Sequence, residues 1–505
     1  MTTTSTVRPR PGGFHALRVR SFRCFFLGQT VSNAGTWMQR IAQSWLVLTL
    51  TGSPVAVGLS GTLQGLPMLL LGLYGGTLVD RFPIRRVLIV TQSTMGVLAA
   101  TLAALTLTST VRIWHVYVLA GLLGAVQAFD TPARQALVLE LVPDADAHSA
   151  VGLSQASWHA SRLVGPAAAG ALIAAAGSGE AFALNAASFG AVVAGLLLIR
   201  PQDLHARTRS RRSPGQVREG LRYVRSRSDL ARTVILAGFV GWFGYNFPVV
   251  LTSFSSDVFH VGPGWYGLFS AGTGAGSLLG ALVAAHRPHA GIRMLAVTAG
   301  LFGVSEAVGA LAPGTVSFAL MLALVGALGT VFYVTSSAAA QLAALPEMRG
   351  RVMGVYTVAF TAPLGGPLVG WFITQVGPRV SMAAFGLVPA AAAAALIAFR
   401  ARGPGLRTEE GREATRPRDD RHAVGSGVPP RTVARKASGV WPARWWKYLL
   451  KLVALGKPSR TAIWVALWSL WASSRLASSI TRRSMNSLAP APTLERVARE
   501  RVRGE

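Results

Sequence analysis

The sequence predicts an all-α membrane protein, built as two pseudo-symmetric six-helix bundles with a partly disordered C-terminal tail. Three observations lead to this fold class. Hydrophobic residues make up 51% of the 505 positions and charged residues only 14%, which is too apolar for a soluble protein of this length. Runs of about twenty apolar residues, enough to cross a hydrocarbon core of about 30 Å, recur from Phe22 to Phe399. Short patterns also recur at a nearly constant offset of roughly two hundred residues.

The apolar runs predict twelve transmembrane helices. Each span must be helical, because lipid cannot satisfy open backbone groups. In chain order the expected spans are 22–49, 55–79, 86–108, 113–132, 148–176, 179–199, 232–254, 264–285, 291–311, 315–342, 351–375 and 380–399.

The repeated patterns predict that the two bundles are parallel copies of each other. Such a duplication, with cargo handled between the copies, is typical of transporters. The position that matches Asp80 of the first copy is Ala284, so an acidic residue there is not repeated. The matched segments are 76–86 with 280–288, 141–144 with 344–347, and 165–166 with 366–367.

The net charge of +29 is unevenly distributed, because the arginines are concentrated in alternate loops between the expected spans. By the positive-inside rule the Arg-rich loops and both termini are cytoplasmic, and an even number of spans agrees with that placement. We therefore expect a multi-pass protein of the inner (plasma) membrane and no nucleic-acid partner. The arginines that carry the bias include Arg18, Arg20 and Arg23 before the first span, Arg85 and Arg86 after the second, Arg207 to Arg232 between the sixth and seventh, and Arg349 and Arg351 before the eleventh.

Composition divides the chain into four expected regions. Residues 1–200 form the first bundle and residues 232–400 the second. The polar, Arg-rich stretch 201–231 is a cytoplasmic linker, in which 217–227 has the pattern of a surface helix. Residues 401–505 are a basic tail. Its short apolar segments suit interfacial helices on an anionic leaflet, and an unselected extension of the chain is the alternative.

The loop after the second span carries the sharpest local motif: Gly76, Asp80, Arg81, Arg85 and Arg86. The negative end of the helix dipole is a poor site for Asp80, which therefore needs a cationic partner. Arg134 and the helix that begins near Arg351 are candidates besides the arginines of the loop itself. We predict a conformational latch on the cytoplasmic side. A stop signal that needs only the arginines is the alternative.

This loop resembles the signature loop of the major facilitator superfamily and occupies the same place between spans two and three. Pro83 and Ile84 depart from the usual pattern. The segments 22–32, 45–54 and 162–166 resemble the branch that contains enterobactin-type and macrolide exporters. The similarity extends over roughly residues 15–400. It implies a two-bundle transporter that exports small molecules.

Gly165, Pro166 and Gly170 resemble the fifth-span motif of antiporters in this superfamily, with Ala169 in place of one glycine. Small residues let helices approach closely, and a proline removes one backbone hydrogen bond. Gly366 and Pro367 repeat the pattern in the second copy. Helix packing with a kink therefore explains both copies as well as an antiport role does.

Charged residues inside spans are costly and usually face a cavity. Counting along the helices puts Arg40 in the outer half, Arg162 and Glu306 near the midplane, and Asp130 closer to the cytoplasmic end. Burial favours the neutral form of a carboxylic acid, so Glu306 is the candidate for proton coupling. A static pair with a neighbouring arginine is the alternative.

A polar stripe on the first span predicts one wall of the substrate cavity. Asn33, Trp37 and Gln43 lie on this span, and Asn246 of the seventh span extends the same surface. Tryptophans such as Trp37 line an apolar cargo site in this interpretation. Lipid-facing anchors are the commoner use of such residues.

We expect a secondary active transporter that exports a small amphipathic molecule, such as a drug, antibiotic or siderophore, in exchange for protons. An importer of a small solute, or a receptor or regulator on the same fold, are the alternatives. No catalytic constellation, metal site or ATP-hydrolysing motif stands out, so the sequence predicts no enzyme and no cofactor. The expected partners are cargo, protons and the bilayer, with a monomeric chain.

Overall fold

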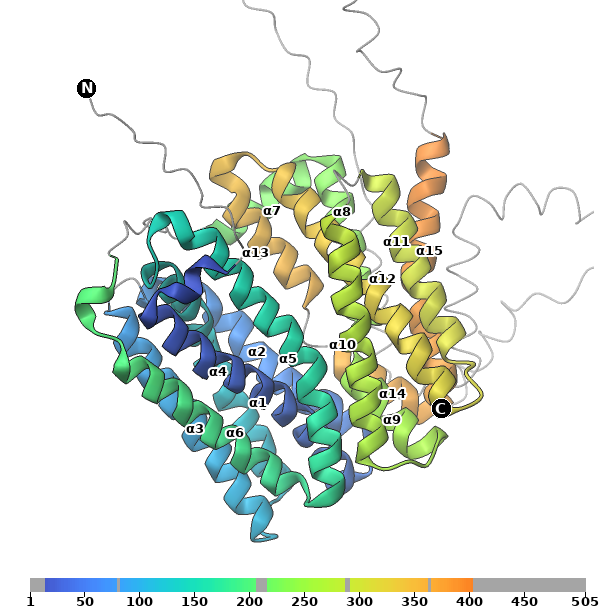
Figure 1. Cartoon of the computed structure of the whole chain (residues 1–505). Coiled ribbons are helices and arrows are strands. Elements are labelled where there is room, and N and C mark those ends of the chain that lie inside the picture. Colours follow the sequence, from blue (N-terminus) through green and yellow to red (C-terminus); the bar gives the residue numbers. More distant parts are fainter. Residues whose placement is uncertain (1–13, 80–81, 206–215, 287–290, 362–364, 403–505) are drawn as a thin grey trace, which may run out of the picture. The chain divides into compact units, whose positions relative to one another are not determined.

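A computed structural model describes residues 14–79, 82–205, 216–286, 291–361 and 365–402. The regular structure within these ranges is entirely helical and contains no β-strand (Figure 1). An all-α membrane fold is therefore confirmed for the described part of the chain.

Six long helices form the first half of the described chain. Their bounds lie close to the expected spans, except that α4 continues to Glu140 through Pro132. A membrane helix tolerates such a proline, because neighbouring groups satisfy the backbone carbonyl that it frees. The elements are η1 (His15–Arg18), α1 (Arg20–Thr51), α2 (Pro54–Val79), α3 (Ile84–Leu107), α4 (Ile113–Glu140), η2 (Asp144–Asp146), α5 (Ala147–Ala175) and α6 (Ser178–Leu198).

The second half contains more and shorter helices. A linker helix, α7, precedes it where the sequence predicts a surface helix. The elements are η3 (Pro201–Asp203), α7 (Gln216–Ser226), α8 (Ser228–Phe239), η4 (Val240–Gly244), α9 (Phe247–Ser253), η5 (Phe254–Val258), α10 (Pro263–Ala285), α11 (Ile292–Gly309), α12 (Thr315–Leu342), η6 (Pro346–Met348), α13 (Arg349–Phe360), α14 (Gly365–Val376) and α15 (Pro378–Arg402).

The expected seventh and eleventh spans are not continuous α-helices. The seventh is α8 and α9 joined by the π-helical segment η4, and the eleventh is divided into α13 and α14. The two interruptions lie against each other. A Cβ on Gly365 would stand 2.7 Å from the carbonyl oxygen of Trp242, and Gly241 packs on the backbone of Phe360. Backbones can approach this closely only where glycine omits the side chain.

Ten helical segments of the described chain are long and apolar enough to cross a membrane. α1 and α5, the other two of the twelve expected spans, are 32 and 29 residues long but fall outside this group. Both carry polar residues along one side, from Gln29 to Gln43 on α1 and from Ser154 to Arg162 on α5. Their low hydropathy is consistent with polar faces turned away from lipid.

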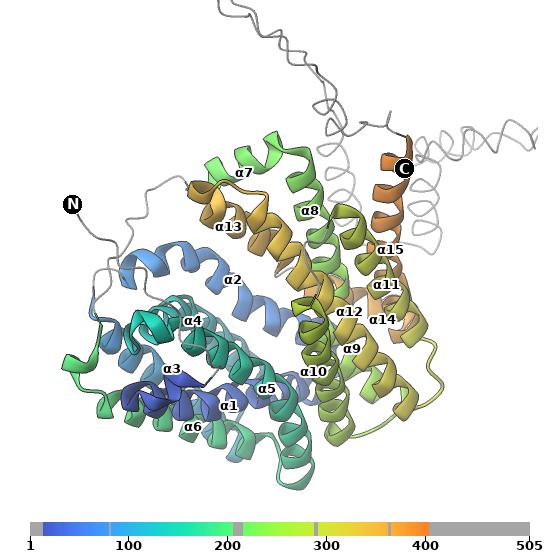
Figure 2. The same ribbon diagram turned by 45° about the horizontal axis from the view of Figure 1, so that its top comes forward.

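Helix pairing repeats in the two halves. α2 packs on α4 and α3 on α6, as α10 packs on α12 and α11 on α15. Glycines mediate several of these contacts: Gly124 of α4 lies against the backbone of Gln64, and Gly276 of α10 against that of Ala323. The duplicated sequence thus corresponds to a duplicated arrangement of helices (Figure 2).

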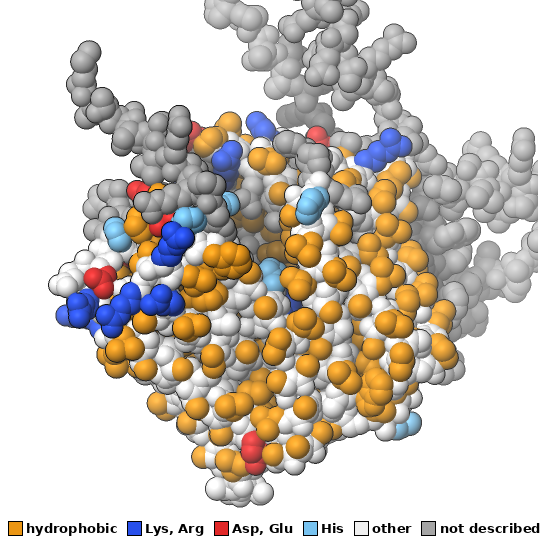
Figure 3. Space-filling view, viewed as in Figure 1, with side chains coloured by type: hydrophobic (Ala, Val, Ile, Leu, Met, Phe, Trp, Pro, Cys, Tyr) orange, Lys and Arg blue, Asp and Glu red, His pale blue; other side chains and the backbone are white. Residues whose placement is uncertain are grey.

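Hydrophobic side chains cover much of the visible outer surface of the helices, whereas arginine side chains gather along the upper and upper-left edge (Figure 3). This is the edge where α7 and α13 lie (Figure 1). We call it the basic end; α1, α3 and α5 begin there, and α2, α4 and α6 end there. The opposite end holds the connections at 52–53 and 259–262.

Candidate binding cavity

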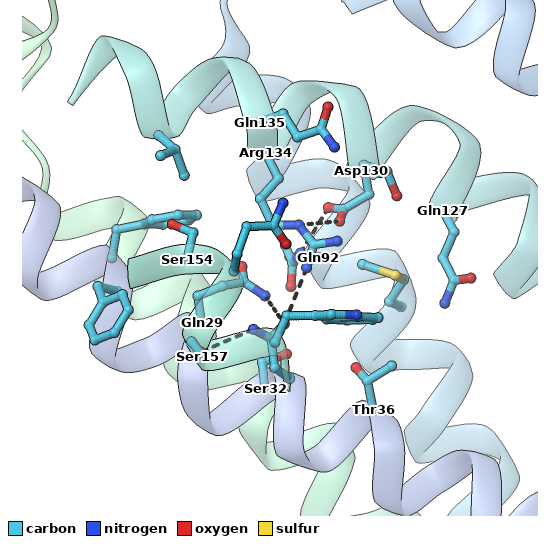
Figure 4. Close-up of a pocket in the computed structure, with 18 of the residues that line it drawn as sticks. Gln29, Ser32, Thr36, Gln92, Gln127, Asp130, Arg134, Gln135, Ser154 and Ser157 are labelled. Carbon is cyan, nitrogen blue, oxygen red and sulfur yellow. Dashed lines mark hydrogen bonds and ion pairs between the residues drawn. The ribbon is translucent and has the colours of Figure 1, made fainter. Parts of the chain in front are cut away.

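A cavity of about 600 Å³ lies among the helices of the first half (Figure 4). It begins near the basic end, where Phe25 of α1, Val138 of α4 and Val151 of α5 line it. From there it extends to Met95 of α3 and Phe189 of α6, which lie near the middle of their helices. The polar residues that line it are Gln29, Ser32, Asn33, Thr36, Arg40, Gln92, Gln127, Asp130, Thr131, Arg134, Gln135, Ser154, Gln155 and Ser157.

Asp130 is the charged group most firmly held in the cavity wall. Its side chain is 2% exposed, and one carboxylate oxygen accepts hydrogen bonds of 2.8 Å from the hydroxyl of Thr91 and from the amide of Gln92. Its other oxygen lies 3.9 Å from Nε of Arg134 on the same helix. Both oxygens of Asp130 therefore have partners, as a buried carboxylate requires.

Asn33 joins α1 to α4 and α5. Its side-chain oxygen accepts hydrogen bonds from the amide of Gln29, at 2.9 Å, and from Nη1 of Arg134, at 3.3 Å. Its own amide donates to the hydroxyl of Ser157, at 3.3 Å. Ser157 in turn donates to Thr30, at 2.9 Å. The predicted cavity residue Asn33 is thus a wall residue whose orientation three helices determine.

Two tryptophans and three arginines form a layered cluster beside this network. The rings of Trp37 and Trp158 have their centroids 5.4 Å apart. The guanidinium carbons of Arg40 and Arg162 lie 4.7 and 5.6 Å from the centroid of Trp37, and that of Arg134 lies 5.9 Å from Trp158. Distances of this order are typical of cation–π interactions.

Gly165 explains why α5 can reach this cluster. A Cβ at this position would stand 2.7 Å from the carbonyl oxygen of Ala34 and from Cβ of Trp37. The absence of a side chain lets α5 press against α1 directly beside Trp37. This glycine of the predicted motif therefore shapes the cation–aromatic cluster.

The arginines of the cluster differ in their partners. Arg134 has Asp130 and Asn33. Within the described residues, neither Arg40 nor Arg162 has an ion pair or a hydrogen bond to a protein atom, and the two repel each other electrostatically. Nε1 of Trp37 is likewise buried without a hydrogen-bond acceptor. The cluster therefore contains several donors without an acceptor; of Arg40, Arg162 and Trp37, only Arg40 lines the cavity.

Glu306 stands apart from these residues, in the second half. It is 5% exposed, and its Oε2 has no hydrogen-bond partner among the described residues. It lies in the last turn of α11, closer to the opposite end of that helix than the expected midplane position. Tyr245 interacts electrostatically with both Glu306 and Arg162.

Both glycine–proline motifs lie where the two halves touch. A Cβ on Gly170 of α5 would stand 2.9 Å from Cα of Gly267 in α10. A Cβ on Gly366 of α14 would stand 3.1 Å from Cα of Gly58 in α2. These contacts belong to the parts of the helices nearer the opposite end. The helix-shaping residues Gly165, Pro166, Gly170, Gly366 and Pro367 are thus interface positions, between helices or between halves.

The predicted latch is only partly visible. Asp80 and Arg81 lie outside the described residues, and Gly76 belongs to α2. Arg85 donates hydrogen bonds of 2.8 and 3.2 Å to the carbonyls of Leu196 and Leu197, so it caps the end of α6. Arg86 is exposed.

Outside the loop, the sequence offered Arg134 and the N-terminus of the helix near Arg351 as partners for Asp80, and the side chains of both Arg134 and Arg351 interact with other residues. Arg134 interacts with Asp130 and Asn33, and Nη1 of Arg351 lies 2.5 Å from Glu219 of α7. The latch stays a prediction.

Among the other predicted site residues, Arg40 and Asp130 line the main cavity with Asn33, and Gln43 lines a smaller pocket beside it. Asn246 does not join them, because its amide donates to the carbonyl of Trp242, at 2.6 Å. Sequence reasoning missed Gln29 and Gln92. Gln29 lies four residues before Asn33 on the same helical face, and Gln92 is a polar residue within an apolar span, so both signals were present.

Comparison with known proteins gives a consistent result. The family model for transmembrane secretion effectors matches residues 11–420. The uncharacterized MFS-type transporter YfiS of Bacillus subtilis (strain 168) is 28% identical over 270 residues, 51% of this chain and 62% of that protein, so the match spans less than two thirds of the relative's length. Macrolide efflux protein A of Streptococcus pyogenes is 26% identical over 373 residues, 70% of this chain and 90% of the relative.

Among solved structures, a bacterial homologue of the human lysosomal transporter Spinster, in an inward-facing and occupied conformation, matches with a TM-score of 0.58. The match has 14% sequence identity and covers 76% of this chain and 97% of that one. Such a low identity supports a shared fold and no more.

Proposed function

The chain belongs to the transmembrane secretion effector family of major facilitator transporters, and from this premise we propose that it exports small amphipathic molecules in exchange for protons. Export from the cytoplasm is in keeping with macrolide efflux protein A, whose name describes that activity. We do not infer from that relative that macrolides are the cargo of this chain.

One observation supports the proposal: the residues that line the cavity extend from the basic end to the middle of the helices, while the glycine contacts Gly170–Gly267 and Gly58–Gly366 between the two halves lie towards the opposite end. With the basic end in the cytoplasm, this arrangement corresponds to the cargo-loading state of an exporter. Rocking of one bundle against the other would break the contacts Gly170–Gly267 and Gly58–Gly366 and open the other side. Small residues suit such an interface, since they make no interlocking side-chain contacts.

Glu306 is the proposed proton carrier. A buried carboxylate without a partner favours its neutral form, and exposure to water or to a cation favours release of the proton. Its position in the last turn of α11 is near the side from which protons would enter. Tyr245 interacts electrostatically with Glu306 and with Arg162, and in our proposal it couples the carboxylate to the first half.

The test uses inside-out membrane vesicles that carry the full chain, with an imposed pH gradient, acid inside. Three probes are compared: anionic anilinonaphthalenesulfonate, neutral phenylnaphthylamine and cationic tetraphenylphosphonium. We expect accumulation of at least one probe in the lumen. Glu306→Gln should abolish accumulation driven by the gradient while leaving downhill equilibration of the probe.

Glu180→Gln is the matched control. It removes a glutamate from the first turn of α6, at the end of the molecule opposite the basic end, and it should leave accumulation unchanged. Failure of the vesicles to accumulate any probe would overturn export. Uptake only in right-side-out vesicles would instead identify an importer. An unchanged pH profile in Glu306→Gln would assign that residue to structure rather than coupling.

A further inference from the structure

We propose that Arg40, which lines the inner part of the cavity, forms an anion-binding site together with Arg162 and Trp37, which lie beside it but do not line the cavity, so that the cargo joins an acidic group to an aromatic or apolar body. The acidic group is a carboxylate, sulfonate or phosphate. This inference rests on the proposed export function and names the chemical class of its cargo.

The charge of the cavity wall is uncompensated. Arg40, Arg134 and Arg162 all belong to the cation–aromatic cluster, and Asp130 is the only carboxylate that lines the cavity in the described part of the chain. That carboxylate already interacts with Thr91, Gln92 and Arg134. It is therefore not available to neutralise Arg40 or Arg162.

Arg40 and Arg162 are in addition held close together. Both lie over the ring of Trp37, from α1 and α5 respectively, and each disfavours the charge of the other. A cation–π contact stabilises a guanidinium by less than the cost of removing that guanidinium from water. An anion between the two side chains would relieve both their repulsion and their loss of hydration.

The donors suit an oxyanion. A guanidinium presents planar pairs of N–H groups that match carboxylate, sulfonate and phosphate oxygens, and a cation–π contact through the face of the guanidinium leaves those edges free. Trp37 Nε1 is a further buried donor without an acceptor. The cluster thus offers unfilled donors from two helices, and no carboxylate among the described residues pairs with Arg40 or Arg162.

The protein's own lone carboxylate does not fill the site. Glu306 belongs to α11 in the second half, and it forms no ion pair with Arg40 or Arg162 among the described contacts. Tyr245 lies between Glu306 and Arg162 in the electrostatic sense, since it interacts with both. In this arrangement Arg40 and Arg162 therefore have no carboxylate partner among the described residues, and an anion that binds them would come from outside the protein.

The aromatic part of the cargo follows from the same cluster. Trp158 of the Trp37–Trp158 pair lines the cavity together with Phe25, Phe26 and Phe189. Aromatic rings attract one another beyond the effect of their burial, so a flat apolar body would lie against these side chains. An inorganic anion alone would leave this surface uncovered.

An anionic lipid offers the same acidic chemistry as a soluble cargo. We commit to the soluble aromatic anion, because polar side chains of α1, those of Gln29, Asn33 and Thr36, line the cavity between Phe25 and Arg40 among its apolar residues. Binding is therefore measured in nanodiscs of phosphatidylcholine alone and in nanodiscs that contain phosphatidylglycerol, with the full-length chain.

Calorimetry with the two matched probes tests the proposal. Anilinonaphthalenesulfonate and phenylnaphthylamine differ only in the sulfonate. We expect the anion to bind at least about tenfold more tightly, as a hydrogen-bonded charge contributes about 1.5–3 kcal/mol. Combining Arg40→Gln with Arg162→Gln should remove that preference and leave the affinity for the neutral probe within about twofold.

Arg232→Gln is the matched control: it removes an arginine that is exposed on α8, and it should change neither affinity. Arg40→Lys keeps the charge without the planar fork and should give an intermediate loss. Unchanged binding of the neutral probe also verifies that the double variant is folded.

Several outcomes would overturn the proposal. They are equal binding of the two probes, an unchanged anion preference in the double variant, and loss of anion binding whenever phosphatidylglycerol is present, which would identify a lipid site. Accumulation of tetraphenylphosphonium but not of the anion in the vesicles described above would overturn the anion site and leave export standing. No accumulation of any probe would instead count against export itself.

Discussion

The two halves of this chain repeat one helix arrangement and fill it differently. The interior of the first half is a polar cavity with a hydrogen-bonded network around Asp130 and Asn33. The interior of the second half is packed with rings: Tyr245 lies 5.7 Å from Phe302 and 4.9 Å from Phe360, centroid to centroid. Its one buried carboxylate, Glu306, has an oxygen without a described partner.

This difference shows how a duplication can separate two tasks. In our proposal the first half binds cargo through donors on α1 and α5, and the second half carries the proton on Glu306. Tyr245 connects them electrostatically. The polar residues of a cavity wall need many hydrogen-bonding neighbours, whereas a carboxylate that carries a proton needs few. Two copies can meet both demands.

We expect the largest effect on transport from a substitution at a contact between the two halves. In Gly58→Val the new Cβ would stand 2.6 Å from the backbone nitrogen of Pro367 in α14's motif. Such overpacking costs about 1–3 kcal/mol, so probe accumulation in vesicles should fall by about tenfold or more.

Gly61→Val is its control on the same helix, since nothing lies within 4 Å of a Cβ there. Equal transport by Gly58→Val and Gly61→Val would contradict the role that we assign to the Gly58–Gly366 contact between the two halves.

A second prediction contrasts the buried carboxylates of the two halves. Asp130→Asn removes the charge that Thr91, Gln92 and Arg134 satisfy, and should lower the free energy of unfolding by about 1–3 kcal/mol. Glu306→Gln removes a group without such partners and should not destabilise the protein.

Thermal unfolding of both variants in detergent measures the contrast. A larger loss for Glu306→Gln than for Asp130→Asn would reverse the assignment of structural and functional carboxylates.

A third prediction concerns the loop in which the two copies differ, Asp80 against Ala284. Asp80→Asn should reduce transport about fivefold while membrane insertion is retained, since one charge at a helix end contributes about 1 kcal/mol. The arginines that set topology remain.

Asp229→Asn, at the exposed start of α8, serves as the control for loss of one acid at the basic end. Normal transport by Asp80→Asn would contradict the predicted role of Asp80 as part of a conformational latch.

The smallest effect is expected from the tail, which follows α15 and has no counterpart in the first half. Deletion of residues 403–505 should leave probe accumulation within about twofold of the full chain, because all residues of the proposed cargo and proton sites precede residue 403. A complete loss of accumulation, with the shortened protein still present in the membrane, would show that the tail takes part in transport.

Much of the architecture was predictable because lipid imposes strong rules on a helix. Apolar runs near the membrane thickness predicted helices such as α3 and α12 to within a few residues, and loop arginines predicted one basic edge. The broken seventh and eleventh spans were not predictable. η4 and the division between α13 and α14 depend on close backbone contacts at Gly241 and Gly365, between helices far apart in sequence.

The candidate site divides in the same way. By itself, the sequence determined which polar residues are too costly for lipid, and so identified Asn33, Arg40, Asp130, Arg162 and Glu306 as interior candidates. Only the tertiary structure decided their partners. It brought Asp130 to Gln92, placed Arg40 and Arg162 on Trp37, and left Glu306 with an unpartnered oxygen. Hydropathy belongs to each residue separately, whereas a hydrogen bond or an ion pair depends on two side chains that folding alone brings together.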